Sequence, residues 1–368
     1  MTNFYITHAK KLDWILIASA VLITVFGLVA LYSTGMAKGN FNNFEKQLIF
    51  FVIGFSLMLA ISFFDYRILR NNSYLILVLY FICLALLAGL HFFAPVIRGT
   101  HGWYRLGFLT LDPIETMKIV LIILLAKYFS MRHVQMYKLQ HILISGLYAL
   151  TPAALVFIKP DLGGAAVFVA MWLGILLVSG IKLKHFLILG ICFLLVSGFS
   201  WQFLLKDYQK GRVTAFLFPT DVLGGSWSQA QTKISIGSGR WFGQGVTGDS
   251  QVQYGFLPEP HTDFIFSVIA EEWGLIGMAV FFGAYLLLVW RILKVSIESS
   301  SNFPRLFGIG FAIMLIAQFT VNIGMNLSLL PVVGIYLPLV SYGGSGLIAN
   351  FVSLGVLQSI KTRTLTNY

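Results

Sequence analysis

Apolar residues along this chain gather in long blocks separated by polar stretches. Most blocks run for about 20 residues, the length at which an α-helix crosses roughly 30 Å of hydrocarbon. The pattern predicts ten membrane-spanning helices, at 13–34, 46–64, 73–94, 113–131, 141–158, 162–180, 185–205, 264–291, 306–327 and 345–360. The chain is therefore expected to be an all-α polytopic membrane protein. An even number of spans puts both chain ends on one side of the membrane.

The composition excludes a water-soluble fold. Charged residues make up 11% of the 368 residues, against about 25% in soluble domains, and mean hydropathy is +0.84. The first apolar block is too long for a signal-peptide core and lacks a small-residue cleavage site, so it is interpreted as a retained first span. The two cysteines, Cys83 and Cys192, lie inside apolar blocks, which indicates neither a disulfide framework nor a Cys-rich metal site.

Lysine and arginine predict the orientation of the spans. With the N-terminus inside, the inner segments carry 14 of the 25 basic residues, the short outer loops carry six, and the long 206–262 loop carries the other five. This bias places both termini in the cytoplasm. The formal net charge of +11 therefore reflects membrane orientation and contact with anionic lipid, and it does not indicate nucleic-acid binding.

Two outer segments depart from the simple helical pattern. Residues 206–262, before the eighth span, form a long polar loop whose aromatic residues argue for an ordered segment along the membrane, since disordered segments lack aromatics. Residues 331–346, before the tenth span, hold two prolines and four glycines beside an apolar stretch. Irregular backbone at membrane depth is tolerated where it lines a cavity, so this segment is predicted to be partly re-entrant. No linker or internal repeat divides the chain, so residues 1–368 are predicted to form one transmembrane domain.

Ionisable residues at membrane depth are costly, so each is a candidate functional residue. Four outer groups qualify: Glu115 with Lys118, Lys159 with Asp161, Arg212 with Lys233, and Asp263 with Glu271 and Glu272. Glu115 and Lys118 stand three apart on one helix, so they can form a structural ion pair or the polar lining of an outward-facing cavity. Asp161 can cap the sixth span, or it can present a carboxylate to the same cavity.

Asp263 immediately precedes the eighth span. It can serve as a helix N-cap. However, Ser267, Ala270 and Gly274 would lie under it on one helix face. Such a stripe of small residues leaves room beside the carboxylate for a substrate or an approaching helix. A capping role and a catalytic or binding role therefore both stay open.

Two further motifs carry weaker signals. His261 is a lone histidine with no second His or Cys at metal-ligand spacing, which favours a hydrogen-bonded loop residue. The glycine-rich run 237–245 looks like a phosphate loop but lacks the Gly-Lys-Ser/Thr ending and a preceding strand. Its backbone N–H groups could still meet a pyrophosphate.

Taken in order, the outer motifs resemble the shape, elongation, division and sporulation (SEDS) family. The motifs are Asp112-Pro113-Ile114-Glu115 with Lys118, Pro160-Asp161-Leu162-Gly163, Asp207-Tyr208-Gln209 with Arg212, Lys233-Ile234-Ser235-Ile236-Gly237-Ser238-Gly239, Leu257-Pro258-Glu259 with His261-Thr262-Asp263-Phe264-Ile265-Phe266, Asn322-Ile323-Gly324-Met325, Leu329-Leu330-Pro331-Val332-Val333-Gly334, and Ser341-Tyr342-Gly343-Gly344. The match covers essentially the whole chain. The Asn-Ile-Gly-Met and Pro-Val-Val-Gly runs look like the RodA, elongation-type branch.

The resemblance implies a ten-helix peptidoglycan glycosyltransferase in the bacterial plasma membrane. Its substrate would be lipid II, the undecaprenyl-pyrophosphate-linked disaccharide peptide, and its partner a class B penicillin-binding protein transpeptidase. The resemblance also implies that Asp263 occupies the family's essential acidic position. The further polar positions of the family's cavity are matched by Glu115, Lys118, Asp161, Gln209, Arg212 and Lys233.

The chain departs from the family pattern at several positions. The family's Gln-Pro-Ser-Glu reads Asp-Pro-Ile-Glu here, with Ile114 in place of serine. Gly102 stands where an arginine usually precedes the tryptophan, and Tyr336 and Gly346 replace a proline and a serine. These departures bear on the fit of the sugar or the stem peptide.

The expected reaction joins a sugar 4-hydroxyl to an anomeric carbon that carries lipid pyrophosphate. Asp263 is the candidate general base, and Arg212, Lys233 or a divalent cation, Mg²⁺ or Mn²⁺, could stabilise the leaving pyrophosphate. The alternative is a flippase or transporter of the lipid-linked precursor, which intramembrane charges and broken helices also suit. The missing repeat and the gathering of charge on one face favour the enzyme, and a mere scaffold would leave the buried carboxylates unexplained.

Overall fold

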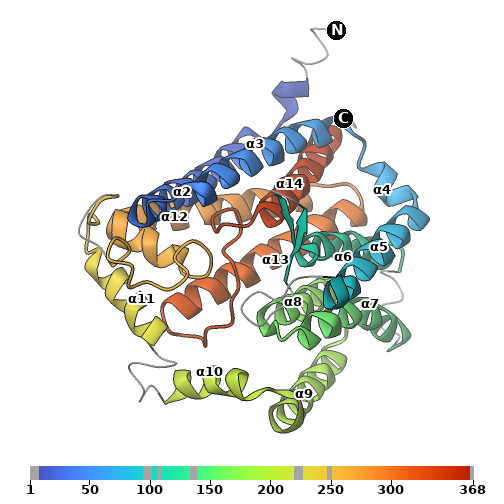
Figure 1. Cartoon of the computed structure of the whole chain (residues 1–368). Helices are drawn as coiled ribbons and strands as arrows, with labels where there is room; N and C mark the ends of the chain where they lie inside the picture. Colours follow the sequence, from blue (N-terminus) through green and yellow to red (C-terminus); the bar gives the residue numbers. More distant parts are fainter. Residues whose placement is uncertain are drawn as a thin grey trace.

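The computed structural model describes residues 8–93, 102–106, 109–132, 139–218, 227–246 and 251–364. Each of the ten predicted spans is a helix there, which confirms the predicted fold class (Figure 1). The helices are α2 (Trp14–Lys38), α3 (Asn42–Phe63), α5 (Ser73–Phe93), α6 (Pro113–Ser130), α7 (Leu139–Ile158), α8 (Leu162–Val178), α9 (Leu183–Phe199), α12 (Ile265–Ile297), α13 (Asn302–Asn326) and α14 (Gly344–Thr364). Among these described helices, seven are long and apolar enough to cross a membrane. Of the others, α8 is shorter, and α6 and α14 are buried along most of their length.

Aspartates begin three of the helices. The side chains of Asp13, Asp112 and Asp161 accept the N–H of a residue two or three positions further on, at 2.8–3.0 Å. An aspartate here stabilises a helix because it satisfies an N–H group that the first turn leaves without a partner. The capping role considered for Asp161 is thus confirmed. By contrast, α12 has Phe264 at its N-cap position, and the Phe264 side chain makes no cap hydrogen bond.

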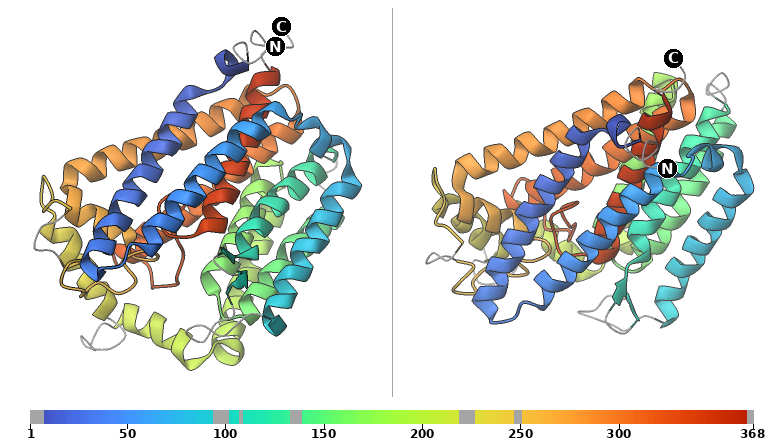
Figure 2. Two further views of the ribbon diagram at one scale, coloured as in Figure 1. Left: turned by 45° about the horizontal axis from the view of Figure 1, so that its top comes forward. Right: turned by 90° about the horizontal axis from the view of Figure 1, so that it is seen from above.

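The interior of the bundle contains α6, α13 and α14 (Figures 1 and 2). α14 packs along α3, while α12 packs along α2 and α13. Glycines allow the α3–α14 approach: a Cβ on Gly355 would lie 2.9 Å from the Met58 carbonyl oxygen, and a Cβ on Gly54 would lie 3.0 Å from the Phe351 ring. Small residues have this role in membrane helices because they let two backbones come close.

One end of the bundle holds both ends of the described chain (Figure 2). There the Asp13 carboxylate pairs with Arg291 of α12, and Gln358 of α14 exchanges two hydrogen bonds with the Asp13 main chain, at 2.9 and 3.1 Å. These contacts place the start of α2 beside the later parts of α12 and α14. The arrangement agrees with the expectation that an even number of spans returns the chain to its starting side.

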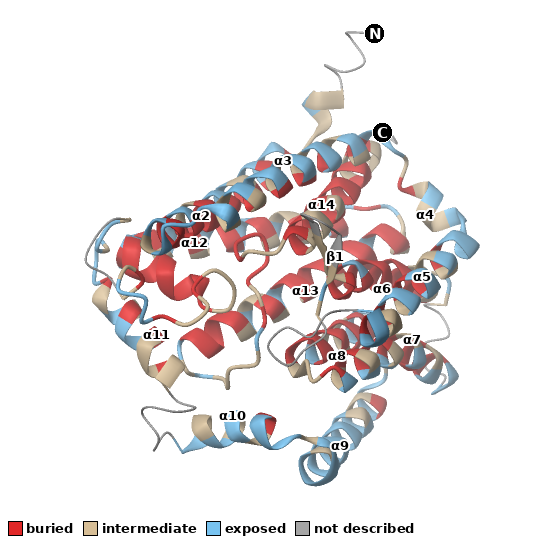
Figure 3. Ribbon diagram, viewed as in Figure 1, coloured by how far each residue is buried: buried red, intermediate tan, exposed pale blue. Residues whose placement is uncertain are grey.

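The α9 helix and the segment after it stand apart from the bundle (Figure 3). α9 continues into a π-helical turn, Ser200–Leu204, and its apolar span is not buried by other parts of the described chain. The predicted outer loop follows and contains two helices, α10 (Asp207–Leu217) and α11 (Trp227–Ser238). Residues 219–226 and 247–250 of that loop lie outside the described residues. The loop is therefore ordered over the parts described, as the aromatic content predicted.

Two short elements add to the spans. A five-residue helix, α4 (Arg67–Asn71), joins α3 to α5. An antiparallel hairpin of β1 (Tyr104–Leu106) and β2 (Leu109–Leu111), which the apolar pattern did not predict, precedes α6. β2 runs directly into Asp112, so the hairpin leads the chain into the first turn of α6.

The eighth span is interrupted, although the sequence pattern predicted a continuous helix. Gly274 has φ 62° and ψ −164°, which only glycine adopts readily. The break would leave backbone groups without partners in the membrane. Instead, the N–H groups of Leu275 and Ile276 donate to the carbonyls of Arg240 and Trp241, at 2.9 and 3.1 Å. The backbone at the break is thereby satisfied inside the protein, as membrane depth requires.

The glycine-rich run 237–245, which begins at the end of α11, also donates hydrogen bonds to α12 just before the break. The N–H groups of Gln244 and Gly245 donate to the carbonyls of Glu271 and Glu272, at 2.9 and 3.0 Å. A Cβ on Gly243 would lie 2.0 Å from the Glu272 carbonyl oxygen, so glycine is required for this approach. The idea that the N–H groups of this run meet a pyrophosphate is wrong for these two residues, because both N–H groups are already used by α12.

Candidate functional site

The segment between α13 and α14 is irregular and turns back into the protein, as predicted. Ser341 organises it: the Leu337 N–H donates to the Ser341 hydroxyl at 2.9 Å, and that hydroxyl donates to the Thr262 carbonyl at 2.6 Å. The next N–H, from Tyr342, donates to the His261 carbonyl at 2.9 Å. The Ser-Tyr-Gly-Gly motif therefore holds the turn that carries Asp263.

Asparagines of α13 fix the main chain of Asp263. The side-chain amides of Asn322 and Asn326 donate to the Asp263 carbonyl, at 3.1 and 3.0 Å. Asn322 also donates to the Ile335 carbonyl at 2.7 Å, and Ser267 donates to the Asn326 side-chain oxygen at 2.7 Å. One buried network thus joins the turn before α12, the end of α13 and the re-entrant segment. It fixes the main chain of Asp263 through the Asp263 carbonyl.

The Asp263 side chain is half-buried and faces the re-entrant segment. A Cβ built on Gly334 would lie 3.6 Å from the Asp263 Oδ2 atom, and Gly334 itself has φ 74°. The absence of a side chain at 334 keeps space in front of the carboxylate. The small residues under Asp263 have a different role: Ser267 bonds Asn326, and a Cβ on Gly239 would touch the Ala270 carbonyl at 2.0 Å. That stripe therefore accommodates protein and not substrate.

A second polar cluster joins α6 to the re-entrant segment. Lys118 donates to Glu115 Oε1 at 2.5 Å, and the Tyr336 hydroxyl donates to Glu115 Oε2 at 2.6 Å. Glu115 and Lys118 are 7% and 2% exposed, so the pair is buried. Both carboxylate oxygens of Glu115 are thus occupied. This geometry favours an ion pair that shapes the site over a free base.

Three charged residues flank α6, α7 and α8: Asp112 precedes α6, and Lys159 and Asp161 lie in the turn between α7 and α8. Burial raises the pKa of the Asp112 carboxyl to about 7, with the neighbouring Glu115 charge adding to the effect. Burial also raises the pKa of Asp161, and it lowers the pKa of the Lys159 ammonium to about 8. The surrounding protein replaces part of the water around these groups and so disfavours their charged forms. Lys159, which sequence reasoning grouped with Asp161, is buried, and its ammonium makes no hydrogen bond within the described chain.

The loop helices contribute the remaining predicted residues unequally. Arg212 of α10 donates to the Val332 carbonyl at 3.3 Å, which ties α10 to the re-entrant segment. Gln209 is buried, and its side-chain oxygen accepts the Lys206 N–H at 3.0 Å, a cap of its own helix. Lys233 is exposed on α11. The structure therefore brings Arg212 to the re-entrant segment, while the Gln209 side chain is used within α10.

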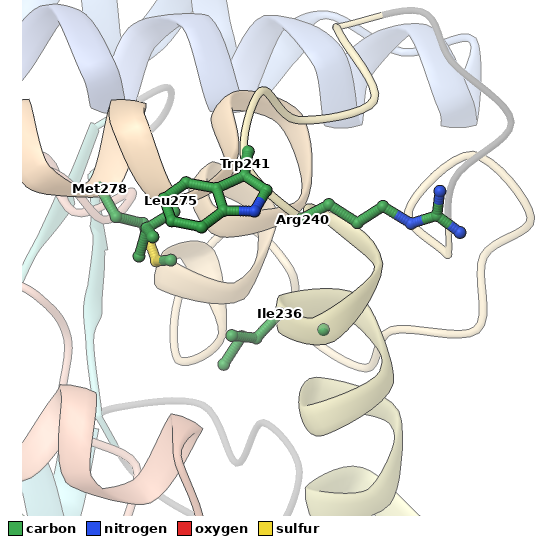
Figure 4. Close-up of a pocket in the computed structure, with 6 residues that line it drawn as sticks. Ile236, Arg240, Trp241, Leu275 and Met278 are labelled. Carbon is green, nitrogen blue, oxygen red and sulfur yellow. The ribbon is translucent and has the colours of Figure 1, made fainter.

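Two hollows open on the surface away from the polar clusters. One, of about 480 Å³, lies between α11 and the second half of α12; its apolar walls include Ile236, Leu275 and Met278 (Figure 4). In that view the Arg240 side chain extends away from Leu275 and Met278. The other, of about 620 Å³, is an apolar groove lined by α7, α8 and Leu189 of α9. Neither hollow is lined by a carboxylate, which separates them from the Asp263 site.

Metal ligands are sparse in the described residues. No group of three or more His, Cys, Asp or Glu side chains there could hold a metal ion. His261 Nε2 lies 3.5 Å from Glu259 Oε2, and its ring lies edge-on to Tyr342. These contacts agree with a loop histidine.

The chain that carries this site matches an established family over most of its length. A sequence model described as FtsW/RodA/SpoVE cell cycle protein matches residues 13–366. The chain belongs to this family. Family membership accounts for the order of the outer motifs along the whole chain.

Individual relatives agree with this membership. The peptidoglycan glycosyltransferase MrdB of Escherichia coli strain K12 is 38% identical over 288 residues, which cover 77% of each chain. Stage V sporulation protein E of Bacillus subtilis strain 168 is 32% identical and covers 96% of this chain and 98% of its own. The MrdB match agrees with the elongation-type branch that the motifs favoured.

Solved structures of the family share the fold. A chain from a peptidoglycan synthase complex that coordinates polymerization and crosslinking has a TM-score of 0.81 and 31% identity, covering 96% of this chain and 98% of its own. The rod shape determining protein RodA of Thermus thermophilus has a TM-score of 0.69 and 30% identity, covering 95% of this chain and 96% of its own. Both share the overall fold of this chain.

Sequence reasoning missed several residues that build the site. Asn326 bonds the Asp263 carbonyl and is itself bonded by Ser267, while Tyr336 bonds Glu115 and is bonded by Asn350. One signal was available: Asn322 and Asn326 stand four apart and so share a face of an otherwise apolar helix. The contact of Tyr336 had no such signal, because its partner lies 221 positions away.

Proposed function

We propose that this protein is a peptidoglycan glycosyltransferase that polymerises lipid II into glycan strands during cell elongation. The observation that carries the proposal is the half-exposed Asp263 carboxylate, whose main chain is held by Asn322 and Asn326 and which faces the side-chain-free Gly334. A general base needs a fixed position and open space for its partner hydroxyl. The named activity of the MrdB relative supports the same reaction.

In the proposed reaction Asp263 accepts the proton of a sugar 4-hydroxyl as its oxygen attacks the anomeric carbon of the second substrate. The new glycosidic C–O bond forms while the C–O bond to the lipid pyrophosphate breaks, and the pyrophosphate leaves with that electron pair. Direct attack with a single base inverts the anomeric carbon. Holding both lipid-anchored substrates in line lowers the barrier by several kcal/mol.

The leaving pyrophosphate requires charge stabilisation more than a proton. Arg212 of α10 contacts the re-entrant segment by donating to the Val332 carbonyl, and Lys233 is exposed on α11. A divalent cation, Mg²⁺ or Mn²⁺, would supply further Lewis-acid stabilisation. The described residues hold no group of three or more His, Cys, Asp or Glu side chains that could hold a metal ion, so the substrate phosphates would supply most of its ligands. No other cofactor is proposed.

A lipid-linked substrate also needs an apolar surface for its chain. The groove of about 620 Å³ between α7, α8 and α9 is lined by side chains such as Leu143, Leu147 and Leu189. Its apolar lining suits an isoprenoid chain. The exposed position of α9 at the edge of the bundle leaves this groove open to the membrane.

The proposed location is the bacterial plasma membrane, with cytoplasmic termini and with residues 206–262 and Asp263 on the outer side. The positive-inside bias of the sequence supports this orientation. A class B penicillin-binding protein transpeptidase is proposed as partner. The similarity to a chain of a complex that coordinates polymerization and crosslinking supports that assignment.

The deciding experiment supplies purified protein with lipid II, with and without a class B penicillin-binding protein, and measures glycan chains. We expect glycan from the wild type, and a loss of at least about a hundredfold in Asp263→Asn, since a general base contributes about 10²–10⁴. Thermal unfolding should stay close to wild type in that variant. Near-normal synthesis by Asp263→Asn would remove the catalytic assignment. Lipid II translocation across vesicles without glycan formation would favour the flippase.

A further inference from the structure

The Tyr336 phenol reaches from the re-entrant segment to the ion pair on α6. Its hydroxyl donates to Glu115 Oε2 at 2.6 Å, while Lys118 holds Glu115 Oε1 at 2.5 Å. The Lys118 Nζ atom also lies 5.6 Å from the centroid of the Tyr336 ring, a cation–π distance. Tyr336 therefore contacts both members of the pair.

Gly346, in the first turn of α14, makes room for this phenol. A Cβ built on Gly346 would lie 2.8 Å from the Tyr336 Oη atom, 3.0 Å from Cζ and 3.2 Å from Cε2. Contacts this short cannot persist, so a side chain at 346 would displace the ring. Tyr336 and Gly346 fit each other as a pair. They are also two of the positions at which the chain departs from the family pattern.

A serine at 346, as in the family pattern, would bring its own hydroxyl to the same place. Its Oγ would stand one bond beyond a Cβ that itself lies 2.8 Å from the Tyr336 hydroxyl oxygen. Asn350, one turn further along α14, donates to the Gly346 carbonyl at 2.8 Å and to the Tyr336 hydroxyl at 3.4 Å. The space beside Glu115 can thus receive a hydroxyl from residue 336 or from residue 346.

We infer that Tyr336 is a positioning residue of the proposed transferase. Its phenol hydroxyl holds Glu115 in place, a role that the hydroxyl of a serine at position 346 would otherwise fill. The inference rests on the proposed function. Fixing Glu115 fixes the direction of the Lys118 ammonium, which has three N–H donors and gives one to Glu115. The others can then meet an anionic group of the substrate, such as its pyrophosphate. Tyr336 acts on the reaction only through these two residues.

The test moves the hydroxyl from one residue to the other. Tyr336→Ala should lower kcat for glycan synthesis from lipid II by about tenfold or more, as expected when a hydrogen bond to a charged group is lost. Tyr336→Ala with Gly346→Ser should recover most of the rate. Tyr336→Ala with Gly346→Ala, which fills the space without a hydroxyl, should not. Equal rates in the two double variants would overturn the inference.

A second set of variants keeps the test independent of folding. Tyr336→Phe removes the hydroxyl alone and should lower kcat in the wild-type background but not further in Glu115→Ala, because both changes remove the same hydrogen bond. Additive losses would contradict action through Glu115. The control is Tyr285→Phe, which removes a buried hydroxyl bonded to the Leu315 carbonyl at 3.3 Å and should leave the rate unchanged.

Failure of the proposed function gives a different pattern of results. If wild-type protein makes no glycan, the fit between the two residues is still measurable by thermal unfolding. Gly346→Ser should lower Tm in the presence of Tyr336 and have little effect in the Tyr336→Ala background. An equal loss of Tm in both backgrounds would show that Tyr336 does not occupy the space beside Gly346.

Discussion

Glu115 shows how neighbours assign a role to a buried carboxylate. Its two oxygens accept hydrogen bonds from Lys118 and Tyr336, so it is held as a charged partner within the site. Loss of one partner of a fully buried pair costs about 3–5 kcal/mol, and water at the mouth of the site should reduce this to about 2 kcal/mol. Glu115→Ala should therefore lose stability and activity together, measured by thermal unfolding in detergent beside the polymerase assay.

The charge swap Glu115→Lys with Lys118→Glu separates pairing from substrate contact. Stability should recover in part, since the pair is rebuilt at the same spacing. Activity should recover little if either residue also touches substrate. A Glu115→Ala protein with full stability and no activity would instead assign Glu115 to the chemistry.

Asp112 predicts a pH dependence of stability. Its pKa is raised to about 7 in the folded protein from an ordinary value of 3.8, so the folded state binds its proton more tightly than the unfolded state. The carboxyl therefore stabilises the fold below about pH 4, and this contribution is lost as the pH rises through about 7. A shift of this size equals about 4 kcal/mol, and water at the site should reduce it to about 1–2 kcal/mol.

Asp112→Asn isolates this effect because asparagine caps a helix as well as aspartate does. The variant should match wild type near pH 4 and unfold at a higher temperature at pH 8. Thermal unfolding followed between these values checks the sign. An unchanged pH profile in the variant would show that Glu115, Asp161 or another group carries the dependence.

At the scale of elements, the break in α12 is the feature on which the site depends. Gly274 has φ 62°, and a Cβ there would lie 2.3 Å from the Gly243 nitrogen. Gly274→Ala combines backbone strain of about 1–3 kcal/mol with a clash against a backbone that cannot move freely. It should lower Tm strongly and reduce activity by displacing the half-helix that follows Asp263.

A matched control lies further along the same helix. A Cβ on Gly283 would meet nothing within 4 Å, so Gly283→Ala should be neutral or stabilising by up to about 1 kcal/mol. Thermal unfolding of both variants compares the same chemical change at a broken and an unbroken position. Equal effects at 274 and 283 would contradict a required left-handed conformation at the break.

At the scale of the whole molecule, the orientation in the membrane is a testable prediction. Single cysteines at Tyr254 in the outer loop and at Asn72 between α4 and α5 should label from opposite sides in a Cys83→Ser, Cys192→Ser background. Both positions are exposed, so access to a membrane-impermeant reagent decides the result. Labelling of both from the same side of sealed vesicles would refute the ten-span topology.

The sequence by itself determined the ten spans, because bilayer thickness dictates how long an apolar helix must be. It also pointed to Asp263, Glu115 and Lys118, since charges at membrane depth are rare and need a reason. The capping role of Asp161 could be predicted from the sequence because the cap joins residues only three positions apart. These features depend on neighbours along the chain, which a sequence displays directly.

The tertiary structure alone decided how those residues act. The break at Gly274 is stable because residues of the glycine-rich run 237–245 form hydrogen bonds with the backbone around it. Asp263 is fixed by side-chain amides about 60 positions away in the chain. Glu115 receives its second partner from Tyr336, and Gly346 admits that partner by lacking a side chain. Each of these contacts joins residues that are distant in sequence. A periodic pattern carries no information about such distances, because only the packing of the helices brings the partners together.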